Sequence, residues 1–333
     1  MASARTAAGA KPLLAALLQL AVGLALLTVG GIFLVRGATA VALLARVSTT
    51  VIGLTVVAAG TSLPELAVSV DAARIGSTTM ACGNVVGSNI FNIAVVLSLA
   101  ALISNIPVTR QTFRIEYPYL ILTTVLAILL ARDGLYDRIE AFFALTLLTV
   151  FTAYLIRHER KIVPDVERDE LREAVERTSR VDSVRKAWLT NLGFITAGII
   201  LLPAGARLMV EGGVHIAQVL GVGERIVGLT ILAIGTSLPE VATAIVAAKH
   251  NQPGLVLGNV IGSNIFNLQA VLGTTSAVYP VVIEQSARSY DNWVMLGFTL
   301  VLLPLMLTRR QIGKVDASAL ILLFVVYNWF LLR

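Results

Sequence analysis

The chain has 333 residues, of which 56% are hydrophobic and 14% are charged, and its mean hydropathy is +0.83. Roughly a quarter of the residues of a soluble domain are charged, so this composition excludes a soluble globular protein and indicates several membrane crossings. The formal net charge of +6 does not indicate a nucleic-acid partner, because most basic residues lie between apolar segments, where they set membrane orientation. The single cysteine and three scattered histidines argue against a disulfide, redox chemistry and a zinc site.

Apolar segments follow one another along the whole chain. A membrane-spanning helix needs about 20 mainly apolar residues, and ten segments meet this length, so the predicted fold is an all-α polytopic membrane protein with ten transmembrane helices. The first segment follows Lys11 as a signal peptide would, but it is longer than a signal core and residues 38–46 contain no convincing cleavage site. The ten segments are 12–35, 47–73, 78–103, 115–131, 136–156, 187–210, 226–248, 254–280, 291–307 and 315–331.

The one extended polar segment, residues 157–186, carries charges that alternate in sign. This pattern is typical of a solvated helical connector, with a regulatory element as the alternative. Placing the connector in the cytoplasm also places most of the 26 lysines and arginines on that side. The sequence therefore predicts an integral protein of the cell membrane with both termini outside and a cytoplasmic linker between two sets of five segments.

Two stretches of sequence recur with the same spacing. Residues 61–65 (TSLPE) return at 236–240, and residues 83–92 (GNVVGSNIFN) return at 258–267 with one Val to Ile change, so both motifs are displaced by the same distance along the chain. A shared offset indicates duplication of a whole unit. Five segments per unit is an odd number, so the second unit is expected to be inverted in the membrane, which is typical of secondary transporters. The predicted organisation is a first five-helix repeat at residues 1–156, with its motifs at 58–92, and a second at residues 187–333, with its motifs at 233–267. A charged linker at residues 157–186 connects them.

Two carboxylates lie where a membrane protein rarely places them. Of the 20 Asp and Glu residues, only Glu65 and Glu240 fall deep inside predicted segments with apolar sequence on both sides. A charge at the bilayer centre is costly, and the cores of these segments contain no Lys or Arg to neutralise it. A mobile cation is therefore expected there. The alternative, two protonated structural donors, leaves the repeated hydroxyls and amides unexplained.

Residues near each glutamate supply further oxygen atoms. Pro64 and Pro239 have no N–H, so they are expected to leave the carbonyls of Gly60 and Gly235 without helical partners, a state tolerated in membranes where a cavity or a cation is present. Hydroxyls three or four residues before each glutamate are expected on its helix face, and Ser and Asn of the second motif lie four residues apart. Oxygen-only ligands suit hard cations such as Na⁺ and Ca²⁺. The candidates are Thr61, Ser62, Ser88 and Asn92, with Thr236, Ser237, Ser263 and Asn267 in the second copy.

The second motif also predicts how its helices pack. Glycines at four-residue spacing form the small-xxx-small pattern that lets helices approach closely. These glycines are Gly83, Gly87, Gly258 and Gly262. The remaining amides of the motif are expected to bond to backbone groups exposed by the broken helices. They are Asn84, Asn89, Asn259 and Asn264.

The paired motifs GTSLPE and GNVVGSNIFN resemble the two alpha-repeats of the cation/calcium exchanger superfamily, and most of all its prokaryotic sodium/calcium exchangers. The resemblance covers the whole chain as ten segments, with specific residues in the second, third, seventh and eighth. It implies that Glu65 and Glu240 are the central ion-binding carboxylates, that the hydroxyl and amide candidates are further ligands, and that the carbonyls of Ala58 and Ala233 contribute. It also implies that the first and sixth segments slide as a gate.

The implied activity is that of a secondary antiporter, not an enzyme, exchanging Na⁺ for Ca²⁺ by alternating access at one midplane site. Exchange is expected to be electrogenic. Ca²⁺ and Na⁺ are the expected substrates, and no cofactor is expected. Asn267 stands where relatives frequently carry an aspartate, which in potassium-dependent exchangers is associated with K⁺ transport, so K⁺ independence is expected. A proton-coupled Ca²⁺ exchanger is the main alternative, although GNVVG and GNVIG lack the glutamate of the vacuolar GNxxE motif.

Two other classes fit the sequence less well. A cation channel could use paired carboxylates, but inverted repeats with broken helices favour a carrier. A membrane enzyme is disfavoured because the chain has no Gly-x-Ser-x-Gly, no His-Glu-x-x-His and no aspartate pair within the predicted segments.

Overall fold

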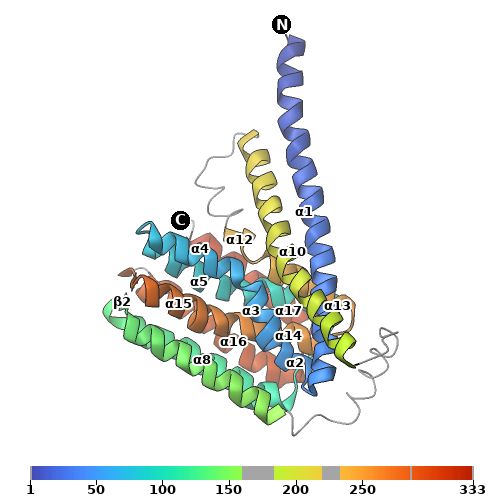
Figure 1. The fold of residues 1–333 in the computed structure, drawn as a ribbon. Coiled ribbons are helices and arrows are strands. Elements are labelled where there is room, and N and C mark those ends of the chain that lie inside the picture. Colours follow the sequence, from blue (N-terminus) through green and yellow to red (C-terminus); the bar gives the residue numbers. More distant parts are fainter. Residues whose placement is uncertain (1, 160–183, 220–232, 286, 332–333) are drawn as a thin grey trace.

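The structure is a computed structural model that describes residues 2–159, 184–219, 233–285 and 287–331. Most of the predicted connector 157–186 and the beginning of the predicted segment 226–248 lie outside the described residues. Figure 1 shows a bundle of helices from which two long helices, α1 (Ala2–Ala45) and α10 (Val184–Val219), extend side by side. Both helices are longer than the predicted segments 12–35 and 187–210. Helix α1 continues through Arg36, whose guanidinium lies 4.9 Å from the centre of the Phe194 ring on α10.

Helices account for nearly all of the described chain, as predicted. Seven of them are long and apolar enough to cross a membrane, and a pair bent by 43°, Thr49–Thr61 with Leu63–Arg74, would be an eighth. These numbers cover the described residues alone, so ten crossings stay a prediction. After α1, the first half contains α2 (Thr49–Ile52), η1 (Gly53–Val57), α3 (Ala58–Thr61), α4 (Leu63–Arg74), α5 (Thr78–Phe91), η2 (Asn92–Val96), α6 (Leu97–Ile103), η3 (Thr112–Glu116), α7 (Tyr117–Leu130), η4 (Ala131–Asp133) and α8 (Arg138–Glu159). After α10, the second contains α12 (Ala233–Gly235), α13 (Leu238–Lys249), α14 (Pro253–Phe266), η6 (Asn267–Val271), α15 (Leu272–Val278), η7 (Ala287–Asp291), α16 (Asn292–Arg309) and α17 (Lys314–Leu331).

The elements repeat with the offset of the motifs. Helices α13, α14 and α15 follow α4, α5 and α6 at the same distance along the chain that separates the two copies of each motif. The π-helical turns η6 and η7 follow η2 and η3 at that distance as well. Four two-residue strands join the halves: β1 (Ile106–Pro107) pairs with β4 (Gln311–Ile312), and β2 (Leu135–Tyr136) pairs with β3 (Val281–Val282), both antiparallel. Each pair therefore contains one strand from each half of the chain.

Helices α1 and α10 touch through glycines spaced seven residues apart. A Cβ atom added at Gly23 would lie 2.8 Å from the carbonyl oxygen of Gly205, and one at Gly198 would lie 2.9 Å from the carbonyl oxygen of Gly30. Side chains would prevent this approach, so the two backbones run against each other along a shared, antiparallel seam.

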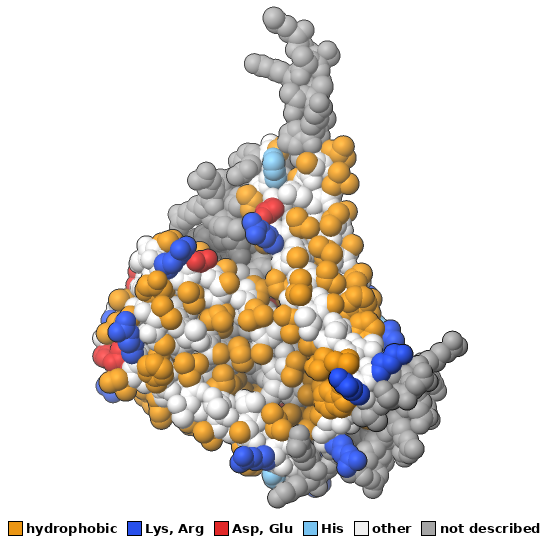
Figure 2. Space-filling view, viewed as in Figure 1, with side chains coloured by type: hydrophobic (Ala, Val, Ile, Leu, Met, Phe, Trp, Pro, Cys, Tyr) orange, Lys and Arg blue, Asp and Glu red, His pale blue; other side chains and the backbone are white. Residues whose placement is uncertain are grey.

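The centre of the bundle is formed by the helices that carry the second motif. Of the most apolar 18 residues in each span, 94% are buried in Pro253–Val278 and 72% in Thr78–Ile103, whereas only 22% are buried in Arg138–His158, which includes most of α8. Figure 2 shows that hydrophobic side chains cover much of the visible outer face, as expected for a surface in contact with lipid. The repeated motifs therefore lie in the interior, and the apolar outer helices surround them.

Candidate cation-binding site

Two interruptions of the helices bring the glutamates to the interior. The backbone leaves helical geometry at Ser62, with φ −85° and ψ 6°, and at Ser237, with φ −91° and ψ 7°. Pro64 and Pro239 occupy the first turns of α4 and α13, where the missing N–H would have had no helical partner. Each glutamate thus lies in the first turn of a new helix, directly after the break.

The two carboxylates are fully buried and are bonded across the halves of the chain. Glu65 has 0% of its surface exposed and Glu240 has 1%. The Ser237 hydroxyl donates to Oε1 of Glu65 at 3.1 Å, and the Ser62 hydroxyl donates to Oε1 of Glu240 at 3.5 Å. The sequence predicted each hydroxyl beside the glutamate of its own motif. The structure differs because the helix breaks at the serine, so that each serine faces the opposite glutamate.

Further hydroxyls adjoin this crossed pair. Ser88 lies 3.4 Å from the Ser237 hydroxyl, and the Thr61 hydroxyl lies 3.3 Å from Oδ1 of Asn259 and 3.4 Å from the carbonyl of Ala58. The Ala58 carbonyl also accepts from the Ser62 N–H at 3.0 Å. Ala233 begins α12, at the edge of the described residues. Ion binding by these two carbonyls stays a prediction.

Several predicted ligands have buried oxygen atoms without a hydrogen-bond partner among the described residues. Native proteins rarely leave such atoms unsatisfied, and a bound ion is one of the usual reasons when they do. Carboxylate, amide and hydroxyl oxygens match the ligands of Na⁺ and Ca²⁺, so this set fits a hard cation as cargo. The atoms are Oε2 of Glu65 and Glu240, Oδ1 of Asn92 and Asn267, Oγ of Ser263 and Oγ1 of Thr236.

The donor set contains few charges. In the described part of the chain, no group of three or more His, Cys, Asp or Glu side chains could hold a metal ion. A cation in this site would therefore meet two carboxylates, with neutral oxygens completing its shell. Such a shell favours exchangeable binding over permanent retention, because it lacks the charge of a dedicated high-affinity cage.

The four remaining motif amides only partly match their predicted role. Asn84 donates to the backbone carbonyl of Glu65 at 3.1 Å, and Asn264 donates to that of Asn89 at 3.2 Å, so both bond to backbone groups, although these carbonyls lie within α4 and α5 and are not those of Gly60 and Gly235. Asn89 donates instead to the Met295 thioether at 3.5 Å, and Asn259 accepts from the Thr61 hydroxyl. The sequence could not identify these partners, because they come from helices far away in the chain.

Two features of the second motif position it against its neighbours. A Cβ atom at Gly262 would lie 2.5 Å from the Leu54 backbone, and one at Gly258 would clash with the Thr50 carbonyl, which confirms the packing role of these glycines. A Cβ atom at Gly83 or Gly87 would meet no described atom within 4 Å, so the packing role of these two glycines stays a prediction. Asn92 and Asn267 each begin a π-helical turn, a feature that often marks functional sites and that the sequence did not predict.

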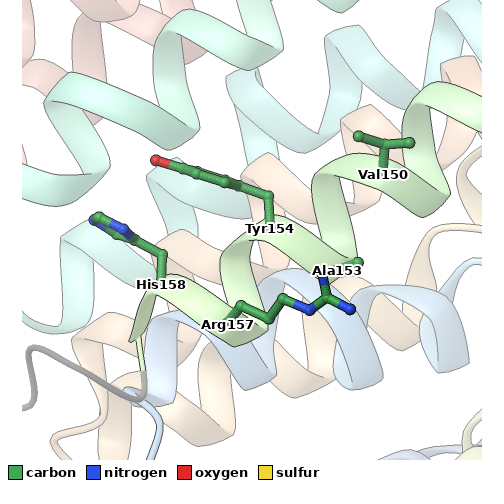
Figure 3. A pocket seen from close by; sticks show the side chains of 5 residues that line it. All are labelled: Val150, Ala153, Tyr154, Arg157 and His158. Atoms are coloured by element: carbon green, nitrogen blue, oxygen red, sulfur yellow. The ribbon is translucent and has the colours of Figure 1, made fainter.

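A surface hollow on α8 lies apart from these residues. It is lined by Val150, Ala153, Tyr154, Arg157 and His158, which all come from one helix, as Figure 3 shows. The lining includes neither a predicted ligand nor one of the serines that bond to the glutamates. The hollow is a feature of the outer face and does not form part of the cation site.

Comparisons with known proteins identify the family of the chain. The family described as "Sodium/calcium exchanger protein" matches residues 15–157 and again residues 190–333. The chain is 37% identical over 322 residues to "Putative antiporter CaxA" of Alkalimonas amylolytica, covering 96% of this chain and 99% of that protein. It is 28% identical over 340 residues to "Sodium/calcium exchanger MaX1" of Methanosarcina acetivorans, covering 93% and 96%.

A solved structure of the sodium-calcium exchanger NCX_Mj, soaked with zero Na⁺ and Ca²⁺, matches with a TM-score of 0.82 and 29% identity. The match covers 96% of this chain and 99% of that one. The chain therefore belongs to the sodium/calcium exchanger family, as an integral membrane protein of the cation/calcium antiporter type.

Proposed function

We propose that this protein exchanges Na⁺ for Ca²⁺ by alternating access at a single site shared by its two halves. The observation that carries the proposal is the crossed pair of buried glutamates, each bonded to a serine of the other half and each keeping one oxygen without a partner among the described residues. One Ca²⁺ would balance the two negative charges. Two Na⁺ would balance them as well, and a third Na⁺ would be held by the adjoining hydroxyl and amide oxygens, which would leave the site with one net positive charge.

Competition for the same oxygens would couple the two ions. A site that holds Ca²⁺ cannot hold Na⁺ on the same carboxylates, so the ions bind in turn. The site with both carboxylates charged and no cation would be too costly to carry across the membrane centre. Exchange of three Na⁺ for one Ca²⁺ would move one net charge, which is worth about 2.3 kcal/mol per 100 mV of membrane potential.

We infer ten membrane crossings in two inverted repeats of five, with both termini outside the cell membrane and the connector in the cytoplasm. The constant offset between matching elements, the two separate family matches and the cross-paired strands support this arrangement. Helices α1 and α10 would form the gate, because their glycine seam holds them together while they lack the ligand motifs. Asn267, which adds no charge, supports K⁺-independent exchange.

The test is ⁴⁵Ca²⁺ uptake into proteoliposomes preloaded with Na⁺, compared with vesicles preloaded with choline and with vesicles that carry only a pH gradient. Uptake that requires the outward Na⁺ gradient, and that grows with an inside-positive potential, is the expected result. Uptake driven by the pH gradient alone would identify H⁺, and not Na⁺, as the coupling ion. Flux that does not saturate and needs no counter-ion would indicate a channel.

A further inference from the structure

Four asparagines form a crossed set of amide hydrogen bonds between the two copies of the second motif. Asn92 donates from Nδ2 to Oδ1 of Asn264 at 3.1 Å, and Asn267 donates from Nδ2 to Oδ1 of Asn89 at 3.3 Å. All four side chains are at most 1% exposed. Asn92 and Asn267 each keep an Oδ1 without a partner among the described residues, whereas the oxygens of Asn89 and Asn264 are used.

The direction of these bonds follows from groups that can only accept. The Asn89 backbone carbonyl accepts from Nδ2 of Asn264 at 3.2 Å, so the Asn264 amide must turn its oxygen toward Asn92. That oxygen requires the NH₂ group of Asn92, which leaves the Asn92 oxygen free. We call each chain of bonded amides an amide relay. The second relay runs from Asn267 through Asn89 and ends in the same way on the Met295 thioether, which accepts from Asn89 at 3.5 Å.

Amide orientation decides whether a cation is attracted. The oxygen end of an asparagine carries partial negative charge and coordinates Na⁺ or Ca²⁺, whereas the NH₂ end repels them. The two ends have nearly the same shape, so packing alone does not choose between them. The choice must come from hydrogen bonds, and here the partner residues supply them.

On the basis of the proposed function, we propose that Asn89 and Asn264 are positioning residues that hold the amides of Asn267 and Asn92 with their oxygens toward the transported cation. Neither positioning residue needs to touch the ion. The second motif also reaches the buried glutamates. Ser88, four residues before Asn92 on the same helix face, lies beside the Ser237 hydroxyl, which donates a hydrogen bond to Glu65. The motif thus supplies two ligands and the groups that orient them.

The test is a double-mutant cycle on Ca²⁺ binding by the purified protein, measured by titration calorimetry, with exchange assayed in parallel. Asn264→Ala should weaken Ca²⁺ binding roughly tenfold, as expected for the loss of one oriented, buried hydrogen bond. A carboxylate has oxygens at both ends and no NH₂ group to donate to Asn264, so in an Asn92→Asp background the same Asn264→Ala change removes no orienting bond and should weaken Ca²⁺ binding by no more than about twofold.

Controls separate orientation from a general loss of packing. Asn328→Ala removes an amide that donates to the Phe324 carbonyl of its own helix, and it should leave Ca²⁺ binding unchanged. An equal effect of Asn264→Ala in the parent and in the Asn92→Asp background would overturn the proposal. If Asn264→Ala does not fold, Asn89→Ala with and without Asn267→Asp tests the second relay in the same way. A parent protein that binds Ca²⁺ but shows no Na⁺-driven uptake would refute the exchange function and still allow the cycle to be measured.

Discussion

Replacing Glu65 by glutamine removes one of the two buried carboxylates while keeping the shape of the side chain. The amide oxygen of glutamine can still accept the Ser237 hydroxyl bond, which is 3.1 Å long in the parent. The change therefore reduces the negative charge of the site from two carboxylates to one, and it keeps the hydrogen bond between residue 65 and Ser237. Glu240→Gln should act in the same way through its bond to Ser62.

The size of the effect follows from burial. Glu65 is 0% exposed, so water cannot replace the lost charge. Breaking a buried ion pair by removing one partner costs about 3–5 kcal/mol, and every 1.4 kcal/mol is a tenfold change, so the Ca²⁺ dissociation constant should rise by about two to three and a half orders of magnitude. The ion-free variant should be no less stable than the parent, because it buries one charge fewer.

Two assays check these expectations. Calcium should raise the melting temperature of the detergent-solubilised parent but not that of Glu65→Gln, since a ligand stabilises only the protein that binds it. Uptake of ⁴⁵Ca²⁺ into proteoliposomes should be lost in parallel. Asp71→Asn is the matched control, because Asp71 lies on the same helix but is exposed and paired with Arg74 at 3.3 Å. Near-normal Ca²⁺ uptake by either glutamine variant would refute the shared-carboxylate site.

Three further perturbations address the ligand shell, the packing and the gate. Asn267→Asp should give a folded carrier with a stronger preference for Ca²⁺ over Na⁺ in competition assays; an unchanged ion profile would place residue 267 outside the site. Gly262→Ala should cost about 1–3 kcal/mol of stability by overpacking. Its melting temperature should lie below that of Gly297→Ala, whose Cβ meets no described atom within 4 Å, and equal values would contradict the packing argument. A disulfide between Gly31→Cys and Val246→Cys, where a Cβ at 31 would lie 3.1 Å from Cγ2 of Val246, should stop exchange reversibly. Full exchange by the oxidised protein would exclude a sliding gate.

The sequence predicted the repeat because its signal is a distance along the chain. TSLPE and GNVVGSNIFN both return after the same number of residues, and the helices of the structure keep that offset. It also predicted the burial of Glu65 and Glu240, which stand in apolar sequence without basic neighbours, but it missed Glu116, which ends η3 and is 1% exposed. Neither inference needs to know which residues of the two halves lie opposite one another.

Contacts between the halves required the structure. Helix periodicity placed Ser62 with Glu65, but the break at Ser62 turns its hydroxyl to Glu240. The amide relays have no signal in a single sequence, because they depend on which residues of the other half lie opposite. The π-helical turns at Asn92 and Asn267 were not predicted either. The orienting role of Asn264 becomes visible only once its partner, 172 residues away in the chain, is known.

The crossed bonds make each half of the site depend on the other. One oxygen of Glu65 accepts a hydrogen bond from a serine of the second half, and one oxygen of Glu240 accepts one from a serine of the first. The two amide relays run across the halves in the same reciprocal manner. A cation bound to both carboxylates would add one more link between the halves, so its arrival and departure would change the balance of forces that holds them together. In the proposed exchanger, this shared construction ties ion binding to the movement that opens the site to one side of the membrane or the other.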